Sequence, residues 1–232
     1  MKNIKALFID LDGTIYDRHI GLEQRVIERM QVYFRDILYY PEHKILPVME
    51  TYYQKHGSTL RGIQMNHDID PDEYLAFVHD VDYHSYLSPD PNLRYILQSI
   101  PLPKWILTNS DRNHTERVLN IMGLEGLFVD IIDVWAMDYL PKPDSRVYDR
   151  ALQIAGGLKA CESMFFDDTI KNLRPAWYKG FTTALVGSSK KQPFATYSLA
   201  TLHEIEEIDI LPQAVPQQMT IQELMAPAEI YS

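Results

Sequence analysis

Short apolar runs bounded by polar turn residues recur along the chain, a pattern typical of strands that are buried on both faces. Stretches with apolar residues at near-helical spacing separate several of these runs, and glycines stand where the helices would end. Strands and helices in alternation predict a parallel sheet that helices cover on both faces. The predicted strands are residues 4–9, 105–107, 131–135, 164–166 and 182–186, and the predicted helices are residues 113–122, 145–155 and 170–179.

One long interval, from residue 15 to residue 88, breaks the alternation because it has helical patterns but no strand pattern. It ends at Ser88-Pro89-Asp90-Pro91, which is typical of a linker or turn. We therefore predict an α/β fold: a doubly wound (Rossmann-like) parallel sheet from residues 1–16 and 89–210, with an all-helical lobe, residues 17–88, inserted after the first strand. The helical spacing in the lobe is carried by Val26, Ile27, Met30, Phe34, Ile37 and Leu38, and more weakly by Leu75, Val78 and Val81.

The C-terminal part of the chain is punctuated by prolines, the first at residue 193 and the last at residue 227. Only residues 199–208 have a helical pattern there. We expect residues 211–232 to form a C-terminal tail, for which the sequence predicts no particular element.

Composition and charge are those of an ordinary globular protein of 232 residues, of which 46% are hydrophobic and 23% charged. A formal charge of −10 without a basic patch makes a nucleic acid an unexpected partner. No stretch approaches the roughly 18 apolar residues of a membrane helix, and the apolar run at the N-terminus is too short for a signal peptide. Cys161 is the only cysteine, which fits a reducing compartment. We expect a cytoplasmic protein without a membrane partner, and the oligomeric state stays open.

The first candidate site is Asp10-Leu11-Asp12-Gly13-Thr14, directly after the first predicted strand. Residues two apart on an extended chain point to the same side, so the carboxylates of Asp10 and Asp12 can converge on one ligand. Gly13 would let the backbone turn sharply while it approaches that ligand closely. An acidic turn that only caps a strand would have the same residues. An EF-hand loop is excluded because its glycine belongs at the sixth position.

Three further clusters follow later predicted strands. They are Thr108-Asn109-Ser110-Asp111, Pro141-Lys142-Pro143-Asp144 and Asp167-Asp168-Thr169. Taken alone, each is an ordinary helix cap or turn. Together with the first cluster, they fall at the carboxyl ends of strands, the edge where open parallel sheets bind ligands. Carboxylates suit a hard cation such as Mg²⁺, and hydroxyl, amide and ammonium groups suit the oxygens of a phosphate.

In this order the four clusters resemble the haloacid dehalogenase superfamily of phosphohydrolases over about residues 4–186. The inserted helical lobe resembles the cap that this superfamily carries between its first two motifs. The residues that further resemble the pyrimidine 5′-nucleotidase subfamily are Tyr53, Gly57-Ser58-Thr59-Leu60-Arg61-Gly62, Thr108-Asn109, Asn113-His114, Asp167-Asp168-Thr169 and Asn172.

The resemblance implies a magnesium-dependent phosphomonoester hydrolase whose small-molecule substrate is a nucleoside 5′-monophosphate, with a preference for pyrimidines. It implies that Asp10 attacks phosphorus and forms an aspartyl phosphate, while Asp12 protonates the leaving oxygen and then deprotonates the attacking water. It also implies that Thr108 and Asn109 bind phosphate oxygens, that Lys142 offsets their charge, and that Arg61 of the cap selects the leaving group. The implied Mg²⁺ ligands are Asp10, the backbone carbonyl of Asp12 and Asp168, with Asp167 either a ligand or a support for the ligands.

Several alternatives stay open. A phosphomutase or another small-metabolite phosphatase of the superfamily would use the same residues. A phosphoaccepting receiver domain, which is a signalling switch, is disfavoured because its acidic pair should end the first strand. A hydrolytic dehalogenase is disfavoured because it needs only one aspartate in the first motif and no metal. A binding protein without activity is disfavoured by the intact set of candidate residues.

Overall fold

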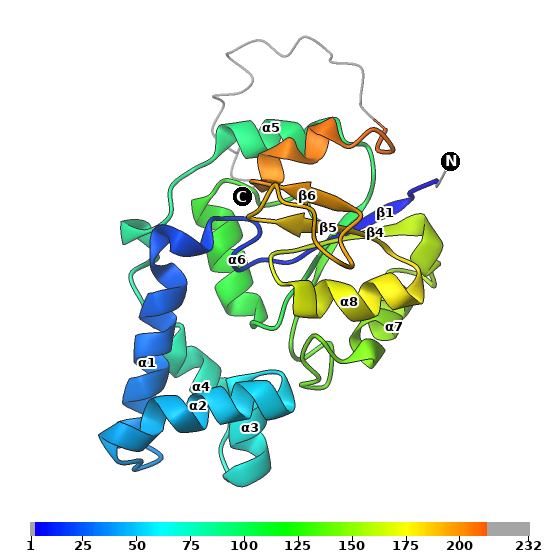
Figure 1. Ribbon diagram of the computed structural model, residues 1–232. Helices are drawn as coiled ribbons and strands as arrows, with labels where there is room; N and C mark the ends of the chain where they lie inside the picture. Colours follow the sequence, from blue (N-terminus) through cyan, green and yellow to red (C-terminus); the bar gives the residue numbers. More distant parts are fainter. Residues whose placement is uncertain (1–2, 213–232) are drawn as a thin grey trace.

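The computed structural model of the protein describes residues 3–212, and its centre is one parallel sheet of six strands (Figure 1). The strand order is β3-β2-β1-β4-β5-β6, so the chain builds the sheet outward from β1 first on one side and then on the other. Every neighbouring pair is parallel, which confirms the doubly wound α/β fold. The strands are β1 (Ala6–Ile9), β2 (Lys104–Leu107), β3 (Asp130–Ile132), β4 (Ser163–Asp167), β5 (Thr182–Val186) and β6 (Tyr197–Leu199).

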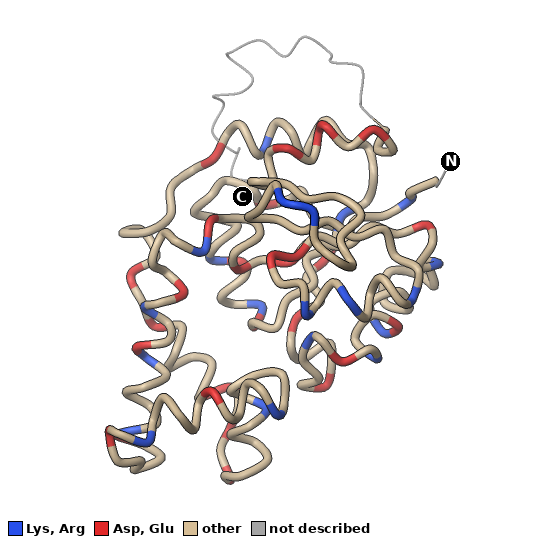
Figure 2. Tube along the Cα trace, in the orientation of Figure 1, with Lys and Arg blue, Asp and Glu red and all other residues tan. Residues whose placement is uncertain are grey.

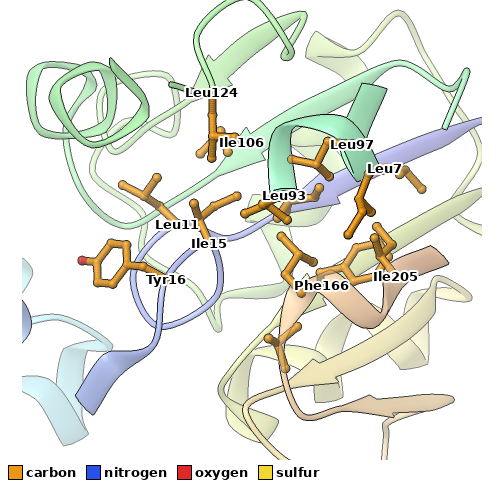
Figure 3. Packing of buried hydrophobic residues seen from close by; sticks show 14 of the residues in the cluster. Leu7, Leu11, Ile15, Tyr16, Leu93, Leu97, Ile106, Leu124, Phe166 and Ile205 are labelled. Atoms are coloured by element: carbon orange, nitrogen blue, oxygen red, sulfur yellow. The ribbon is translucent and has the colours of Figure 1, made fainter. Parts of the chain in front are cut away.

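Helices cover both faces of the sheet because alternate residues of each strand point to opposite faces. Leu7 and Ile9 of β1 belong to a core cluster with α5, α6 and the 3₁₀ helix η4, part of which Figure 3 shows. Ala6 and Phe8 belong to a second cluster with α7 and α8. The covering elements are α5 (Pro91–Ser99), α6 (Arg112–Ile121), α7 (Ser145–Ile154), η3 (Ala160–Glu162), α8 (Ile170–Lys179) and η4 (Leu202–Glu207).

The insertion between β1 and β2 is helical, and most of it forms a lobe beside the sheet (Figure 1). Four lobe helices enclose a third apolar cluster, which includes Phe34, Ile63 and Tyr74. The domain limits of residues 17–88 stay a prediction. The helical elements of the insertion before α5 are η1 (Arg18–Ile20), α1 (Leu22–Asp36), α2 (Glu42–His56), α3 (Thr59–Asn66), α4 (Pro71–Val78) and η2 (Tyr83–Ser85).

Acidic and basic residues alternate along α1 (Figure 2), where Arg25 pairs with Glu28 at 2.6 Å and Arg35 with Asp36 at 2.7 Å. Exposed pairs of this kind contribute little to stability. The buried cluster therefore supplies most of the stability of the lobe.

Some predicted elements differ from the observed ones near the edges of the sheet. The strand predicted over residues 131–135 ends at Ile132, because Val134 leaves the sheet and is buried with lobe residues. Helix α5 was not predicted; it begins at Pro91, the last residue of the segment that we interpreted only as a linker or turn. Of the tail predicted over residues 211–232, residues 213–232 lie outside the described part of the chain.

The helix predicted over residues 199–208 is wrong in its first part. Leu199 ends β6 and pairs with Val186, and only Leu202–Glu207 is helical, as the 3₁₀ helix η4. The apolar residues Leu199, Leu202 and Ile205 are three apart and share one buried cluster. That spacing fits a strand followed by a helix with three residues per turn, as well as the α-helix that we predicted.

Within residues 3–212, no helix has the length and apolar character needed to cross a membrane.

The close packing of α3 on α2 predicts a sharp effect at Gly62. A methyl group added there would lie 2.2 Å from Cβ of Tyr52, on the facing helix. We expect Gly62→Ala to destabilise the protein by about 1 to 3 kcal/mol through overpacking, although alanine favours helices more than glycine does. Urea unfolding measures the change. Met65→Ala, at an exposed position of the same helix, is the matched control, and a Gly62→Ala variant as stable as this control would contradict the packing argument.

Candidate active site

The candidate residues meet where the loops leave the carboxyl ends of β1, β2 and β4. Asp10 follows β1, and its backbone N–H donates to the carbonyl of Phe166 at 2.9 Å, which extends the strand pairing into the loop. Thr108 follows β2 in the same way, donating to the carbonyl of Ile132 at 3.1 Å. Asp167 ends β4 and Asp168 follows it. The parallel sheet therefore brings side chains from distant parts of the sequence to one edge.

The first loop needs a glycine at position 13 because its backbone turns sharply and lies against Asp168. Its φ is +79°, a conformation that favours glycine. A Cβ atom at this position would lie 2.4 Å from Oδ2 of Asp168. The glycine predicted to allow a close approach thus lets the backbone lie directly against a carboxylate.

Lys142 lies in the loop before α7, and its ammonium is buried at the centre of the site. Its Nζ donates to Oδ1 of Asp10 at 2.7 Å, to Oδ2 of Asp167 at 2.8 Å and to the carbonyl of Leu107 at 2.8 Å. Burial alone would lower the pKa of Lys142, but the two carboxylates raise it above its ordinary value. Lys142 is therefore a fixed positive charge with all its protons engaged.

The charged forms of Asp10 and Asp168 are disfavoured by burial and by neighbouring carboxylates. Burial raises the pKa of Asp10 well above its ordinary value; Lys142 partly offsets this effect, while Asp167 and Asp168 add to it. Burial and the nearby Asp167 raise the pKa of Asp168 to about 6. One carboxylate oxygen from each of these three aspartates lies within 4.8 Å of the others. Three carboxyl groups held this close favour either protonation or a cation between them.

Asp167 and Asp168 differ in how many of their oxygens are used. Asp167 accepts hydrogen bonds from Lys142, from the backbone N–H of Thr169 at 2.8 Å and from the amide of Asn172 at 3.0 Å. Asp168 Oδ1 accepts from the Thr169 hydroxyl at 3.0 Å, but its Oδ2 is buried and accepts no hydrogen bond. A guanidinium nitrogen of Arg18 lies 3.1 Å from that oxygen without hydrogen-bond geometry. Asp168 thus offers a ligand atom that accepts no hydrogen bond, although the charge of Arg18 lies beside it.

Asp12 lies outside this acidic cluster and is surrounded by donors. Its Oδ1 accepts from Nε2 of His114 at 2.7 Å and from the hydroxyl of Tyr16, and its Oδ2 accepts from the hydroxyl of Ser110 at 2.7 Å. Burial would raise the pKa of Asp12, but His114, Tyr16 and Ser110 together lower it below its ordinary range. Asp10 and Asp12 are therefore shifted in opposite directions.

Thr108 and Asn109 occupy different environments although they are adjacent. The Thr108 hydroxyl is buried at the site and accepts from the backbone N–H of Ser110 at 3.0 Å. The Asn109 side chain instead pairs with the backbone of Lys142: its Oδ1 accepts from the Lys142 N–H at 2.7 Å, and its Nδ2 donates to the Lys142 carbonyl at 3.1 Å. Asn109 therefore holds the lysine loop, and its binding of phosphate stays a prediction.

A cavity of about 580 Å³ lies between the lobe and this edge of the sheet. Asp12, Asn109, Ser110 and His114 border it from the sheet side. The lobe contributes mostly apolar side chains, among them Met30, Met49, Tyr53 and Leu60, together with the carboxylates of Glu23 and Glu50. The cavity is thus acidic and apolar on its lobe side.

Arg61, the predicted substrate contact in the lobe, is not among the residues that border this cavity. Its backbone N–H donates to the hydroxyl of Ser58, which caps α3, and the neighbouring Leu60 borders the cavity instead. The structure does not bring Arg61 together with the other candidates, because one residue along a helix turns a side chain by about 100°.

Several residues that complete the site were not predicted from the sequence. Tyr16, Ser110 and His114 hold Asp12, and Asn172 holds Asp167. Ser110 lies within one of the quoted clusters, and His114 and Asn172 lie in segments that carry the subfamily resemblance, so proximity to a motif was an available signal. No pattern in the sequence pointed to Tyr16.

Comparisons with known proteins agree with this geometry. Residues 4–176 match the family model of haloacid dehalogenase-like hydrolases. Phosphate metabolism protein 8 of Saccharomyces cerevisiae (strain ATCC 204508 / S288c) is 28% identical over 191 residues, which are 76% of this chain and 59% of the yeast protein. The chain therefore spans less than two thirds of the length of this relative.

Solved structures share the fold at low sequence identity. YfnB from Bacillus subtilis, solved bound to magnesium, is 16% identical with a TM-score of 0.59 and covers 89% of this chain and 99% of its own. The HAD phosphatase from Thermococcus onnurineus is 18% identical with a TM-score of 0.58, covering 88% and 97%. The L-2-haloacid dehalogenase from Xanthobacter autotrophicus is 18% identical with a TM-score of 0.55, also covering 88% and 97%.

These structures show a fold that serves more than one reaction, whereas the family model matches the sequence itself over most of its length. The chain belongs to the haloacid dehalogenase-like hydrolases.

Proposed function

We propose that this hydrolase is a magnesium-dependent phosphatase that cleaves a nucleoside 5′-monophosphate through an aspartyl phosphate on Asp10. The observation that carries the proposal is the contrast between the two aspartates of the first loop. Asp10 lies beside Lys142 and the oxygen of Asp168 that accepts no hydrogen bond, whereas Asp12, two residues on, is held by three donors of its own. A nucleophile next to a cation site and a separate acid–base group are the parts that such a reaction needs.

Magnesium fits the acidic cluster. The proposed ligands are the carboxylates of Asp10 and Asp168 and the backbone carbonyl of Asp12, and oxygen donors of this kind suit a hard divalent cation. Asp168 Oδ2, buried without a hydrogen bond, supports a role as ligand. Both oxygens of Asp167 already accept hydrogen bonds, which supports the role of holding Lys142 and Asn172 in place. The bound ion would offset the charge that otherwise keeps an anionic aspartate from an anionic phosphate.

In the first proposed step, an oxygen of Asp10 forms a bond to phosphorus while the bond from phosphorus to the leaving oxygen breaks. Asp12, which would take up a proton when the anionic phosphate lies beside it, gives that proton to the leaving oxygen. In the second step, Asp12 takes a proton from a water molecule, which attacks phosphorus and releases phosphate from Asp10. The Thr108 hydroxyl and the Lys142 ammonium would bind phosphoryl oxygens. Asn109 would act through the backbone of Lys142, given the hydrogen bonds that join them.

A dehalogenase reaction is the nearest alternative, because dehalogenases and phosphatases are both found among the structures with this fold. A halide leaves as an anion and needs no proton. Asp12 as an acid, and the Asp168 oxygen that accepts no hydrogen bond as a metal ligand, would then have no use. The site of this chain therefore favours phosphate ester cleavage.

The cavity supports a nucleoside as the leaving group. Its volume of about 580 Å³ suits a ligand of that size, and its apolar and aromatic lining suits a flat base. None of the described residues that border it is a lysine or arginine, which disfavours a leaving group that carries a second phosphate. The preference for pyrimidines rests on the subfamily resemblance of the lobe and on the smaller size of these bases.

The proposal predicts phosphate release that needs both Asp10 and Mg²⁺. We expect pyrimidine 5′-monophosphates to be the best substrates in a panel with purine 5′-monophosphates, sugar phosphates and an aryl phosphate. Asp10→Asn should lower kcat by at least roughly 1000-fold, because it removes the nucleophile. Phosphate release is measured with Mg²⁺ and with a chelator.

Asp149→Asn is the matched control, because it makes the same change in an exposed side chain of α7 that pairs only with Lys179. Its activity should stay close to that of the wild type. A wild type that binds Mg²⁺ but releases phosphate from no member of the panel would contradict the proposal.

The raised pKa of Asp168 predicts how stability depends on pH and metal. Since its pKa is about 6 in the folded state and near 4 when unfolded, the folded protein holds this proton more tightly. Without metal, this group makes stability fall as pH rises from about 4 to about 6, by roughly 2 to 3 kcal/mol. Asp168→Asn should remove that loss. Denaturant unfolding in a chelator at pH 4.5 and pH 7.5 measures it.

Magnesium should reverse the loss in the wild type at neutral pH, because it binds the ionised carboxylate only in the folded state. It should stabilise Asp168→Asn much less, while Asp149→Asn should respond as the wild type does. Equal stabilisation of all three proteins by Mg²⁺ would show that Asp168 is not a ligand.

A further inference from the structure

His114 connects the cavity-facing carboxylate of Asp12 to a buried polar cluster beneath it. His114 lies in the first turn of α6, and Asp12 Oδ1 accepts a hydrogen bond from its Nε2 at 2.7 Å. Its other ring nitrogen, Nδ1, lies 2.8 Å from the hydroxyl of Tyr83. Both ring nitrogens are therefore engaged, and the ring cannot turn without losing a contact.

The ring of His114 is also fixed on its face. It stacks on the ring of His79, with centroids 4.3 Å apart and an angle of 23° between the planes. His79 is itself held, because its Nδ1 donates to Oδ2 of Asp111 at 2.5 Å. The other oxygen of Asp111 accepts from the backbone N–H of His114 at 2.8 Å, which closes the cluster on itself.

The residues around His114 belong to the segment that returns from the lobe to the sheet. His79 caps the C-terminus of α4, and Tyr83 begins η2. Arg117 ties this segment to α6 by donating to the carbonyl of His79 at 3.0 Å and by lying over the ring of Tyr83, 4.9 Å from its centroid. The outgoing segment also reaches Asp12, through the hydroxyl of Tyr16. Both connections of the lobe thus converge on this carboxylate.

A purely structural role would account for only part of this arrangement. Asp111 and His79 satisfy each other and cap the helix within the buried cluster, as buried polar groups must. The Nε2–H of His114, in contrast, points out of the cluster to Asp12, which is 28% exposed and borders the cavity. A fixed donor at that place orients the carboxylate that faces the leaving group.

We propose that His114 is the positioning residue of Asp12, and that His79 and Tyr83 of the returning lobe segment hold it in place. The inference rests on the proposed phosphatase function, in which Asp12 gives a proton to the leaving oxygen. In this role His114 neither gives nor takes the proton; it acts by fixing the direction of that proton transfer.

The test compares leaving groups, because misplacing the acid matters only where the leaving oxygen needs a proton. A nucleoside 5′-hydroxyl needs one, whereas 4-nitrophenol leaves readily as an anion. The parameter to compare is kcat/KM, which covers the steps up to departure of the alcohol and excludes the later attack of water on Asp10. We expect His114→Leu to lower kcat/KM for a nucleoside 5′-monophosphate by roughly 10- to 100-fold, and for 4-nitrophenyl phosphate by less than about threefold.

Two further variants separate positioning from folding. His114→Gln keeps an N–H donor at about the reach of Nε2, so it should recover most of the lost activity toward the nucleotide. Tyr83→Phe, which removes the partner of Nδ1, should give a smaller loss with the same dependence on the leaving group. Leu152→Ala, a buried truncation in α7, on the other face of the sheet, is the control and should leave the ratio of the two substrates unchanged.

The outcomes distinguish this inference from the function on which it rests. A wild type inactive toward both esters would overturn both. An active wild type whose His114→Leu variant loses the same factor on both esters would overturn the role of His114 alone, and so would a His114→Gln variant no better than His114→Leu.

Discussion

The ammonium of Lys142 is the interaction on which the rest of the site depends. It binds carboxylates that follow two different strands, together with the carbonyl at the end of a third, so it joins the loops after β1, β2 and β4. Without it, Asp10 and Asp167 would be buried anions without an adjacent positive charge, a loss that typically costs about 3 to 5 kcal/mol. One buried ammonium among three carboxylates leaves two negative charges when all are ionised, and the partly exposed guanidinium of Arg18 beside Asp168 offsets these only in part. A divalent cation is the partner that would balance them.

The same arrangement explains how two aspartates in one short loop become chemically different. Asp10 points into the acidic cluster, where burial and repulsion oppose its charge. Asp12 points toward hydroxyl and imidazole donors, which favour its charge. Because they are two residues apart, both side chains point to the same edge of the sheet. The neighbours that shift their pKa values in opposite directions come from later parts of the chain. The local motif alone therefore does not assign the two roles.

The fold and the meeting of the candidate residues could be predicted because they follow from local patterns. Buried strands give continuous apolar runs, and parallel strands bring Asp10, Thr108 and Asp168 to one edge whatever the details of packing. The matching family model confirms the resemblance that the four clusters suggested. The roles of the individual residues and the limits of the lobe stay predictions.

What the sequence could not give are features decided by tertiary packing. Tyr16 and His114 contact Asp12 only because α6 and the lobe connection lie beside the first loop. Arg61 was predicted from the resemblance of its segment to the subfamily cap, yet it is not among the residues that border the cavity. Leu199, the last residue of β6, begins an apolar spacing of three that also suits a helix. Only its pairing with β5 shows that Leu199 belongs to a strand.

The lobe is tied to the reacting groups by contacts that its own packing does not require. At Gly57, where α2 ends with φ of +85°, a Cβ atom would lie 3.0 Å from the ring of Pro141 and 3.4 Å from the Lys142 carbonyl. The ammonium of Lys171, just after Asp168, lies 4.8 Å from the ring centre of Tyr53 on the same lobe helix. The loop that carries Lys142 is thus hydrogen-bonded to Asn109 on the sheet side and lies close to the backbone of Gly57 on the lobe side. Tyr16, which holds Asp12, directly precedes the lobe. A shift of the lobe would therefore disturb both the lysine loop and the acid–base carboxylate, so the position of the lobe matters for the reacting groups themselves.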